Sequence, residues 1–349
     1  MSQVPVAAPG QQRIGIVGCG AVAHAHADGW RAVGRPAVAL LASGQDATTG
    51  ARPGDRLWGI RVVSQPGELF DEVDVVDICS PAADRLADTL AAAEAGKPAL
   101  CATALAANTQ DAASIVRAFE QAAIPVVVAD GGRRRPEYAS ARMSALSGEI
   151  GEPAVLRLSR MSPPPDRTAR PPGAGDAAAI FFELMIGDLD YARWVAGDVA
   201  SVYAARSGGG PGYALAILKH HGGAITHVEA SWARPLARTM TEVEIAGSLG
   251  LVGFRSEATR PISLRIDPPP PPSPSPSSSA SAQDERPLAS DLAEELGAEL
   301  EQLLAIAGGA PDPVSSPADA LEAVRLAQAA ARSALTGAPV TLARVGGPR

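Results

Sequence analysis

The residues with the clearest chemical potential form a glycine-rich turn near the start of the sequence. Residues 14–17 are a short apolar run, and Gly18, Gly20 and Ala23 follow it with the spacing GxGxxA, ahead of an alanine-rich segment of helical character. The first glycine permits a tight turn, the second lets the backbone approach a pyrophosphate, and the small third residue lets helix and strand pack closely. The helix N-terminus would offer unpaired N–H groups to the phosphates. The segment predicts a dinucleotide-binding turn, with a purely structural turn as the alternative.

Acid–base chemistry could come from two carboxylates and a phenol in the middle of the sequence. Glu183 and Asp188 lie within a predicted helix over Ile180–Val195, and Tyr138 is a nearby proton donor. General acid–base catalysis needs a group whose pKa is near the working pH, and burial in a cleft can raise the pKa of a carboxyl into that range. The alternative is that Asp188 and its neighbour Asp190 are solvated or capping carboxylates.

Two other groups of reactive side chains have ordinary interpretations. Cys19, Cys79 and Cys101 each follow or end a predicted parallel strand, but paired metal-ligand spacings such as C-x₂-C are missing, so buried structural thiols are the favoured interpretation. The run Arg133–Arg135 could hold an anionic group in the cleft, or it could be a solvated surface. No metal site is expected.

Length and composition limit the class of protein. The chain has 349 residues, of which 46% are hydrophobic, so two globular domains are expected. The net charge is −8 and no basic block occurs, which makes nucleic acid an unexpected partner. No apolar run approaches the roughly 20 residues of a membrane span, and no secretory signal is visible at the N-terminus. We therefore expect a cytoplasmic protein with no membrane contact.

The elements that must position these residues fall into two patterns. Over residues 1–130, buried apolar runs alternate with helical segments, which predicts an α/β fold with a Rossmann-type, doubly wound parallel sheet. The predicted strands are Ile14–Val17, Ala37–Ala42, Val73–Cys79, Ala99–Cys101 and Pro125–Ala129, and the predicted helices are Ala21–Val33, Arg85–Ala95 and Thr109–Ala122.

Residues 131–349 are predicted to form an α+β domain with a large, mostly antiparallel sheet for substrate binding and oligomerisation. Its predicted strands are Ala154–Ser159, Val199–Ala205, Tyr213–Lys219, Ala224–Trp232, Thr241–Ala246 and Gly250–Arg255, with a last short strand within Thr336–Leu342. Helices are predicted over Leu288–Ala307 and Pro317–Leu335, while the Pro/Ser-rich stretch 267–287 is predicted to be a disordered insertion.

Six segments, in sequence order, resemble the glucose-fructose oxidoreductase / inositol dehydrogenase / rhizopine-catabolism (Gfo/Idh/MocA) family. They are the glycine turn at 18–23 and the segments 73–81, 94–101, 148–153, 190–197 and 332–340. The resemblance covers residues 13–342. It implies an NAD(P)-dependent oxidoreductase acting on a sugar, a cyclitol or a secondary-metabolite carbonyl or hydroxyl. The cofactor-binding residues that this implies are Gly18, Gly20, Ala23, Ser43, Ser80, Pro81 and Thr103.

The sequence also departs from this family at the positions that carry its acid–base chemistry. Thr103 stands where the family has a catalytic lysine, Gly187 where it has a catalytic histidine, and Arg85 where it has a further histidine. Glu183 matches the family's aspartate and could act as a replacement base. Two alternatives to an active oxidoreductase therefore stay open: an inactive nucleotide- or sugar-binding partner or regulatory subunit, and a non-redox lyase or isomerase using the same cleft.

The expected cofactor is NADP(H) or NAD(H). Ser43 follows the second predicted strand, where NAD-binding folds carry an acidic residue for the ribose hydroxyls. A serine there removes the repulsion against a 2′-phosphate, which weakly favours NADP(H). The expected partners are a small-molecule substrate and, by resemblance, further copies of the chain through the exposed sheet of the second domain, with a hetero-oligomer as the alternative.

Overall fold

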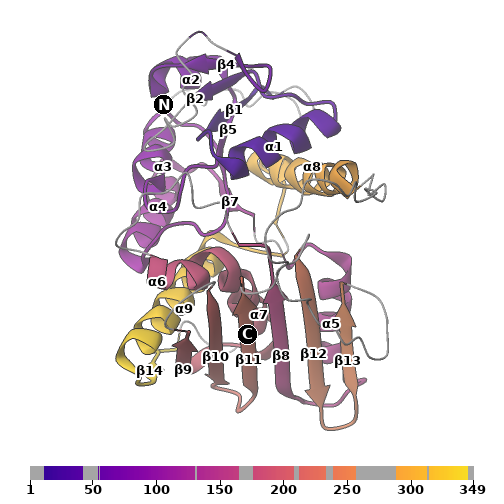
Figure 1. Cartoon of the computed structure of the whole chain (residues 1–349). Helices are drawn as coiled ribbons and strands as arrows, with labels where there is room; N and C mark the ends of the chain where they lie inside the picture. Colours follow the sequence, from indigo (N-terminus) through magenta and orange to yellow (C-terminus); the bar gives the residue numbers. More distant parts are fainter. Residues whose placement is uncertain are drawn as a thin grey trace, which may run out of the picture.

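The computed structural model describes residues 12–41, 54, 56–129, 132–164, 176–207, 212–232, 239–256, 288–312 and 314–344, with the backbone alone at 176–177 and 288–295. Two sheet-based domains lie one above the other (Figure 1). Ser43, the stretch 267–287 and most of the loop that follows Ser162 lie outside the described residues.

The N-terminal sheet has seven strands in the order β3-β4-β2-β1-β5-β6-β7. Its strands are β1 (Ile14–Val17), β2 (Ala39–Leu41), β3 (Arg56–Leu57), β4 (Ile60–Val63), β5 (Val75–Ile78), β6 (Ala99–Cys101) and β7 (Val126–Val128). All neighbouring pairs are parallel except β3 with β4. The chain order reverses between β1 and β5, and the ends of these two strands border the crevice where doubly wound folds bind ligands.

Helices cover both faces of this sheet, which explains why its strands are continuous apolar runs. The helices are α1 (Ala21–Ala32), α2 (Pro66–Glu72), α3 (Arg85–Glu94) and α4 (Thr109–Ala122). Asn108 caps α4 by accepting a hydrogen bond from the Asp111 N–H at 2.9 Å. The predicted parallel sheet is confirmed. The hairpin β3–β4 and α2 were not predicted; β3 has only two residues, which is too short an apolar pattern to detect.

The C-terminal sheet has seven strands in the order β13-β12-β8-β11-β10-β9-β14. They are β8 (Pro153–Met161), β9 (Val199–Arg206), β10 (Tyr213–His220), β11 (Ile225–Ser231), β12 (Met240–Gly247), β13 (Leu251–Arg255) and β14 (Val340–Thr341). Only β8 and β11 pair in parallel, so the predicted, mostly antiparallel sheet is confirmed. Alternate residues of β10 are buried, as expected when helices cover one face of a sheet.

The helices of the second domain are α5 (Pro136–Leu146), α6 (Asp176–Ala179), α7 (Ile186–Ala196) and α9 (Pro317–Thr336). The single helix predicted over Ile180–Val195 begins as a π-helical segment, η2 (Ile180–Met185), which continues into α7. A π-helical segment inside a longer helix often marks a functional position. Ser316 forms a capping box with Asp319 at the start of α9, and Pro317 lies in the first turn.

Helix α8 (Leu288–Ala307) lies beside α1 of the N-terminal domain (Figure 1). The two helices cross at a pair of glycines, where a Cβ on Gly297 would come within 2.6 Å of the Gly29 carbonyl oxygen. Trp30 shares a buried cluster with Leu300, Leu303 and Leu304 of α8. Thus α8 packs with the first domain, although it falls in the range 131–349 that we assign to the second domain from the sequence.

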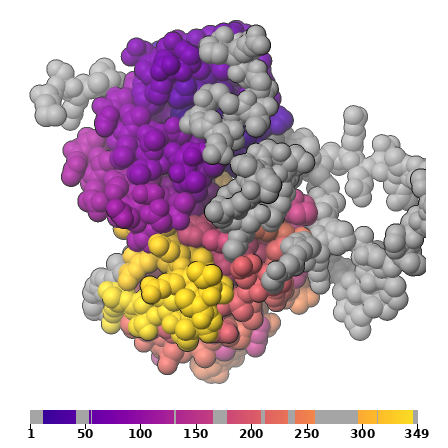
Figure 2. All heavy atoms as spheres, turned by 60° about the vertical axis from the view of Figure 1, so that its left-hand side comes forward, coloured from indigo at the N-terminus to yellow at the C-terminus, as the bar shows by residue number. Residues whose placement is uncertain are grey.

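The two domains also meet through α4 and α9. Thr109 at the start of α4 donates from its N–H and its hydroxyl to the Gln328 side chain of α9, at 2.9 and 2.6 Å. Figure 2 shows α9, in yellow, directly below the helices of the first domain. Within the described residues, no helix combines the length and the apolar character needed to cross a bilayer.

Candidate functional site

The predicted glycine turn joins β1 to α1 at the edge where β1 and β5 end. Gly18 has a φ of +108°, and a Cβ there would lie 2.9 Å from the Ser80 nitrogen, so only glycine fits. Gly20 is the N-cap of α1, where no side chain caps the helix and no acidic residue lies in the first turn. Ala23 is fully buried. The open, uncapped helix start fits the pyrophosphate of a dinucleotide.

The loop after β5 supplies a second feature that fits a ligand. Ser80 is fully buried, and its hydroxyl has no hydrogen-bond partner among the described residues. A buried hydroxyl without a partner is uncommon, because its desolvation is not compensated. Pro81 next to it is exposed. The loop therefore borders the same crevice as the glycine turn and offers one unused hydrogen-bonding group.

A buried ion pair lies under the glycine turn. His26 Nδ1 of α1 is 3.0 Å from Asp77 of β5, and the Trp30 Nε1 donates to the same carboxylate at 2.7 Å. Burial lowers the pKa of His26, but the charge and hydrogen bond of Asp77 outweigh this and raise it above its ordinary value. Burial conversely raises the pKa of Asp77, and the His26 interaction lowers it below its ordinary value. The His26–Asp77 pair therefore joins α1 to β5.

The buried cysteines lie close to this pair but are held as thiols. Cys79 donates to Asp77 at 3.4 Å, and burial raises the pKa of Cys79 well above its ordinary value. Burial likewise raises the pKa of Cys101 to about 12. His26, Asp77 and Cys79 have their polar atoms within 4.8 Å of one another, a set that could surround a metal ion. A protonated thiol is a poor ligand, and each group already bonds to another.

A small cavity of about 20 Å³ lies where the two domains meet. Thr103 of the loop after β6 and Gly187 of α7 both line it, together with Asp190 and Ser315. Thr103 and Gly187 are the two positions where the resemblance puts a lysine and a histidine. The fold therefore brings these positions together, and among the described residues that line the cavity only Asp190 has a titratable side chain.

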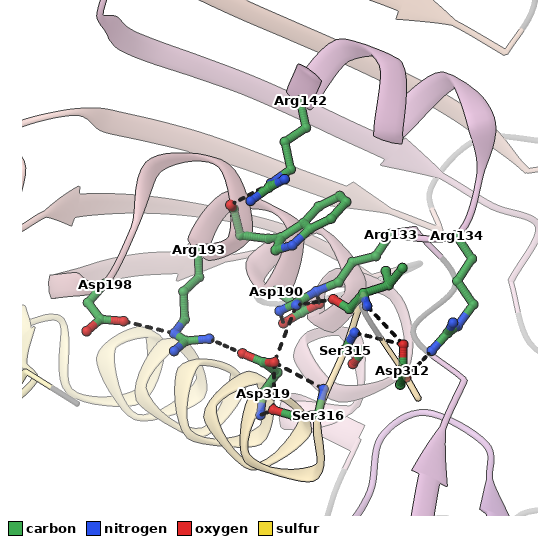
Figure 3. Close-up of polar contacts among 12 residues, drawn as sticks. Arg133, Arg134, Arg142, Asp190, Arg193, Asp198, Asp312, Ser315, Ser316 and Asp319 are labelled. Atoms are coloured by element: carbon green, nitrogen blue, oxygen red, sulfur yellow. Dashed lines mark hydrogen bonds and ion pairs between the residues drawn. The ribbon is translucent and has the colours of Figure 1, made fainter. Parts of the chain in front are cut away.

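Asp190 belongs to a chain of alternating charges, the ion-pair ladder, that extends from the cavity to α9 (Figure 3). Arg133 donates to both Asp190 oxygens at 2.6 and 2.7 Å and lies 3.5 Å from Asp319. Arg193 then joins Asp319 at 2.7 Å to Asp198 at 3.1 Å. Burial raises the pKa of Asp190 despite the opposing effect of Arg133. The cavity wall is thus held by buried ion pairs.

The ladder also fastens the two segments in which the chain passes between domains. Arg133 follows β7 and donates to the Val314 carbonyl at 3.0 Å, in the segment between α8 and α9. Its neighbour Arg134 pairs with Asp312 of that segment at 2.6 Å. Both arginines are thus engaged in internal ion pairs, which corrects the alternatives of an anion clamp or a solvated surface for these two residues.

Two of the predicted catalytic residues meet in the interior of the second domain. The Tyr138 hydroxyl of α5 accepts a hydrogen bond from Arg160 at 3.0 Å, and Arg160 pairs with both Asp188 oxygens at 2.7 and 2.8 Å. Tyr138 is fully buried against Tyr191 and Phe254, and burial raises its pKa. Neither Tyr138 nor Asp188 lines the cavity.

Glu183, the third predicted catalytic residue, is exposed on η2. It precedes Gly187 by four residues, close to one helical turn, so the two positions lie on similar sides of the helix. Thr103 is exposed, and its hydroxyl donates to the Ala129 carbonyl beyond β7.

The interpretation of the sequence missed the partners that organise the site. Arg133, His26 and Asp77 are buried and hydrogen-bonded to residues more than 50 positions away, and buried Arg85 bonds to backbone carbonyls 5 to 19 positions away. No spacing in the sequence links His26 with Asp77, because the fold determines which residue of the helix faces which residue of the strand. The available signal was a charged residue inside an apolar strand pattern, as at Asp77, since such a residue needs a buried partner.

Comparisons with known proteins agree with this architecture. A family model described as "Oxidoreductase family, NAD-binding Rossmann fold" (GFO_IDH_MocA) matches residues 12–129, and a model of the GFO/IDH/MocA C-terminal domain matches residues 138–252. D-apiose dehydrogenase of Paraburkholderia graminis is 28% identical over 69% of this chain and 67% of its own length. D-apiose dehydrogenase of Rhizobium rhizogenes is 29% identical over 72% and 76%.

Solved structures share the fold over nearly the whole chain. GenD2 from gentamicin A biosynthesis, in complex with NAD, superposes with a TM-score of 0.74 at 20% identity and covers 98% of this chain and 100% of its own. Myo-inositol dehydrogenase from Lactobacillus casei, in complex with NAD(H) and myo-inositol, gives a TM-score of 0.72 at 20% identity, covering 96% and 98%.

Proposed function

Because the chain belongs to the Gfo/Idh/MocA family of NAD-binding oxidoreductases, we propose that it transfers a hydride between a nicotinamide cofactor and a sugar, a cyclitol or a related secondary-metabolite carbonyl or hydroxyl. The observation that carries the proposal is the uncapped start of α1 beside the unpartnered Ser80 hydroxyl. The substrate class is supported by relatives that are D-apiose and inositol dehydrogenases.

When bound, the nicotinamide would supply the hydride chemistry. We propose that Gly18, Gly20 and Ala23 hold the pyrophosphate at the start of α1, and that Ser80, Pro81 and Thr103 border the nicotinamide. These residues lie on or follow strands β1, β5 and β6, whose ends share one edge of the sheet. The crevice at that edge is the general ligand position of doubly wound folds.

We propose Glu183 as the acid–base residue, ahead of Asp188 and Tyr138. Its exposed position one turn before Gly187 leaves it accessible to a substrate. Tyr138 and Asp188 are both bonded to Arg160 in the interior, so in this proposal they hold α5 and α7 against β8. General acid–base catalysis requires direct reach, or one water, between the residue and the reacting group.

A specific observation favours a second candidate, a binding protein without catalytic activity. With Thr103 and Gly187 at these positions, Asp190 is the one titratable group among the described residues that line the cavity, and both its oxygens already accept bonds from Arg133. A partner or regulatory subunit would need the nucleotide turn and the cavity but no proton acceptor. The active oxidoreductase and the binding protein would both bind the nucleotide, and they differ only in whether a substrate is turned over.

The deciding experiment starts with titration of the full chain by NADH and NADPH, followed by nicotinamide fluorescence. We expect micromolar binding; the expected preference for NADP(H) depends on Ser43 and is decided by the ratio of the two dissociation constants. Absence of binding at millimolar concentration of both would refute the proposal. Sedimentation velocity on the same sample tests the predicted oligomer.

Hydride transfer is then measured with D-apiose and myo-inositol, for the natural chain and for the double variant Thr103→Lys, Gly187→His. Turnover by the natural chain would eliminate the binding-only candidate. Turnover by the double variant alone would support it, because the variant restores the lysine and histidine of the family pattern at two positions that line one cavity.

A further inference from the structure

Arg85, the first residue of α3, is a buried cation that the proposed chemistry does not use. Its guanidinium Nε donates to the Ser80 carbonyl at 3.1 Å, and its Nη2 donates to the same oxygen. Its Nη1 donates to the carbonyls of Ala102 and Ala104. The side chain is 3% exposed. One guanidinium therefore gathers three backbone carbonyls from two loops.

These partners are unusual for a buried arginine. No carboxylate of the described residues lies within ion-pair distance of Arg85, and burial lowers its pKa. Arginine stays charged in proteins, and a buried charge without a counter-ion is unfavourable unless hydrogen bonds compensate it. The planar fork of a guanidinium can bond several oxygens at fixed angles, which a lysine cannot do. The contacts therefore serve to fix the loops.

The fixed loops are those that border the cofactor crevice. Ser80 follows β5, and Ala102 and Ala104 follow β6, on either side of Thr103. The Thr103 hydroxyl in turn donates to Ala129, which follows β7. Arg85 and Thr103 thereby link the ends of three adjacent strands. The Ser80 carbonyl is bound by Arg85, while its hydroxyl has no partner among the described residues.

We propose that Arg85 is a positioning residue for the nicotinamide half of the coenzyme. By holding the Ser80, Ala102 and Ala104 carbonyls, it fixes the direction of the Ser80 hydroxyl toward the crevice and the backbone on both sides of Thr103. The inference rests on the proposed function, because it needs a coenzyme in the crevice. The adenine half does not depend on Arg85, since the turn at Gly18 packs against the Ser80 nitrogen and not against the carbonyls that Arg85 holds.

The test compares two ligands on the full chain. NADH carries the nicotinamide, whereas ADP carries only the adenine half and the phosphates. We expect Arg85→Lys and Ser80→Ala each to raise the NADH dissociation constant by about tenfold, the loss of about one hydrogen bond to a charged or buried group. ADP affinity, measured by calorimetry, should stay within about twofold. The fluorescence of bound NADH should fall, because its nicotinamide is less firmly held.

Arg117→Lys is the matched control, since Arg117 lies on the exposed side of α4 and donates to Ser114 at 3.1 Å. It should change neither dissociation constant. Ser80→Ala is expected to fold normally, because it removes a buried hydroxyl that has no partner among the described residues. The Ser80→Ala variant therefore tests the inference even if Arg85→Lys does not fold.

Three outcomes separate the possibilities. Unchanged NADH affinity in Ser80→Ala or in folded Arg85→Lys would overturn the inference and leave the proposed function intact. An equal loss of ADP and NADH affinity would show that Arg85 supports the whole domain, which also overturns it. A natural chain that binds ADP but neither NADH nor NADPH, or that binds none of the three, would refute the proposed function itself.

Discussion

The two sides of the domain junction are built by different means. On the cofactor side, the turn at Gly18 is fixed by backbone geometry, with a left-handed φ and no room for a Cβ. On the cavity side, the wall is fixed by side chains, the ion-pair ladder from Asp190 to Asp198. A turn that is fixed by backbone geometry tolerates few substitutions. The residues that line the cavity can change more freely, because the ion-pair ladder behind them maintains its shape.

Thr103 and Gly187 illustrate the consequence. Both line the cavity, and neither takes part in the ladder beneath it. A change of side chain at either position leaves the ion pairs of the ladder in place, because neither residue belongs to it. The comparison therefore predicts that a substitution in the ladder lowers stability without changing cofactor affinity, whereas a substitution in the Gly18 turn lowers both.

The largest effect is expected on the cavity side, from Arg133→Met. The variant keeps most of the side-chain volume but leaves Asp190 and Asp319 buried without their shared cation, so we expect a loss of about 4 kcal/mol in the free energy of unfolding. Urea denaturation measures it, with Arg135→Met, whose side chain is 39% exposed, as control. NADH affinity of the folded fraction should not change. A loss below about 1 kcal/mol would contradict a ladder of this importance.

The next effect is expected on the cofactor side, from Gly18→Ala. Its Cβ would lie 2.9 Å from the Ser80 nitrogen in addition to the strain of the positive φ, so we expect a loss of about 3 kcal/mol and of NADH binding. Gly34→Ala is the matched control, because Gly34 has a φ of +73° with no atom within 4 Å of a Cβ. It should lose only about 1 kcal/mol. Equal losses of stability in the two variants would show that the positive φ alone, and not the contact with Ser80, determines the cost.

A smaller, pH-dependent effect is expected from His26→Gln. The pKa of His26 is raised in the folded protein. Its contribution to the free energy of unfolding is therefore complete below the ordinary pKa of 6.5 and is lost as pH rises through the pKa of the folded state. The pKa of Asp77 is lowered, so its contribution is lost as pH falls below its ordinary 3.8. The natural chain should therefore lose stability from about pH 6.5 upward more steeply than the variant.

At pH 6 the variant should be less stable by about 2 kcal/mol, since Asp77 loses a charged hydrogen-bond partner. Unfolding curves between pH 5 and pH 8.5 measure the difference. His221→Gln, in the exposed turn after β10, is the control and should parallel the natural chain. A constant difference between His26→Gln and the natural chain at all pH values would contradict the ion pair.

The smallest effect is expected from Arg255→Ala on the edge strand β13. Arg255 is 71% exposed and its partner Glu242 is 41% exposed. A pair so open to solvent contributes little, so the free energy of unfolding should change by less than about 0.5 kcal/mol. Thermal unfolding can check this value. A larger loss would mean that exposed ion pairs and the buried ladder do not differ in their contribution to stability.

Much of the fold was predictable because its signals are local. The run from Ile14 to Val17, the glycine spacing after it and the Ser-Pro start of α9 specify their elements by neighbouring residues alone. The segment Ile180–Val195 was predicted to be helical, but its π-helical start was not, since the extra residue per turn leaves no mark on an apolar pattern. The position of α8 beside α1 depends on two glycines 268 residues apart in sequence.

The candidate site divides along the same line. The sequence by itself determined the dinucleotide turn, most of the order of strands and helices, and the family, because backbone conformation follows from glycine spacing and from hydrophobic periodicity. Only the tertiary structure decided that Tyr138 and Asp188 share Arg160 in the interior, that Arg133 supports Asp190, and that Arg85 gathers three carbonyls. Charge pairing acts through space, and a charged residue has no local signal for the partner that burial will give it.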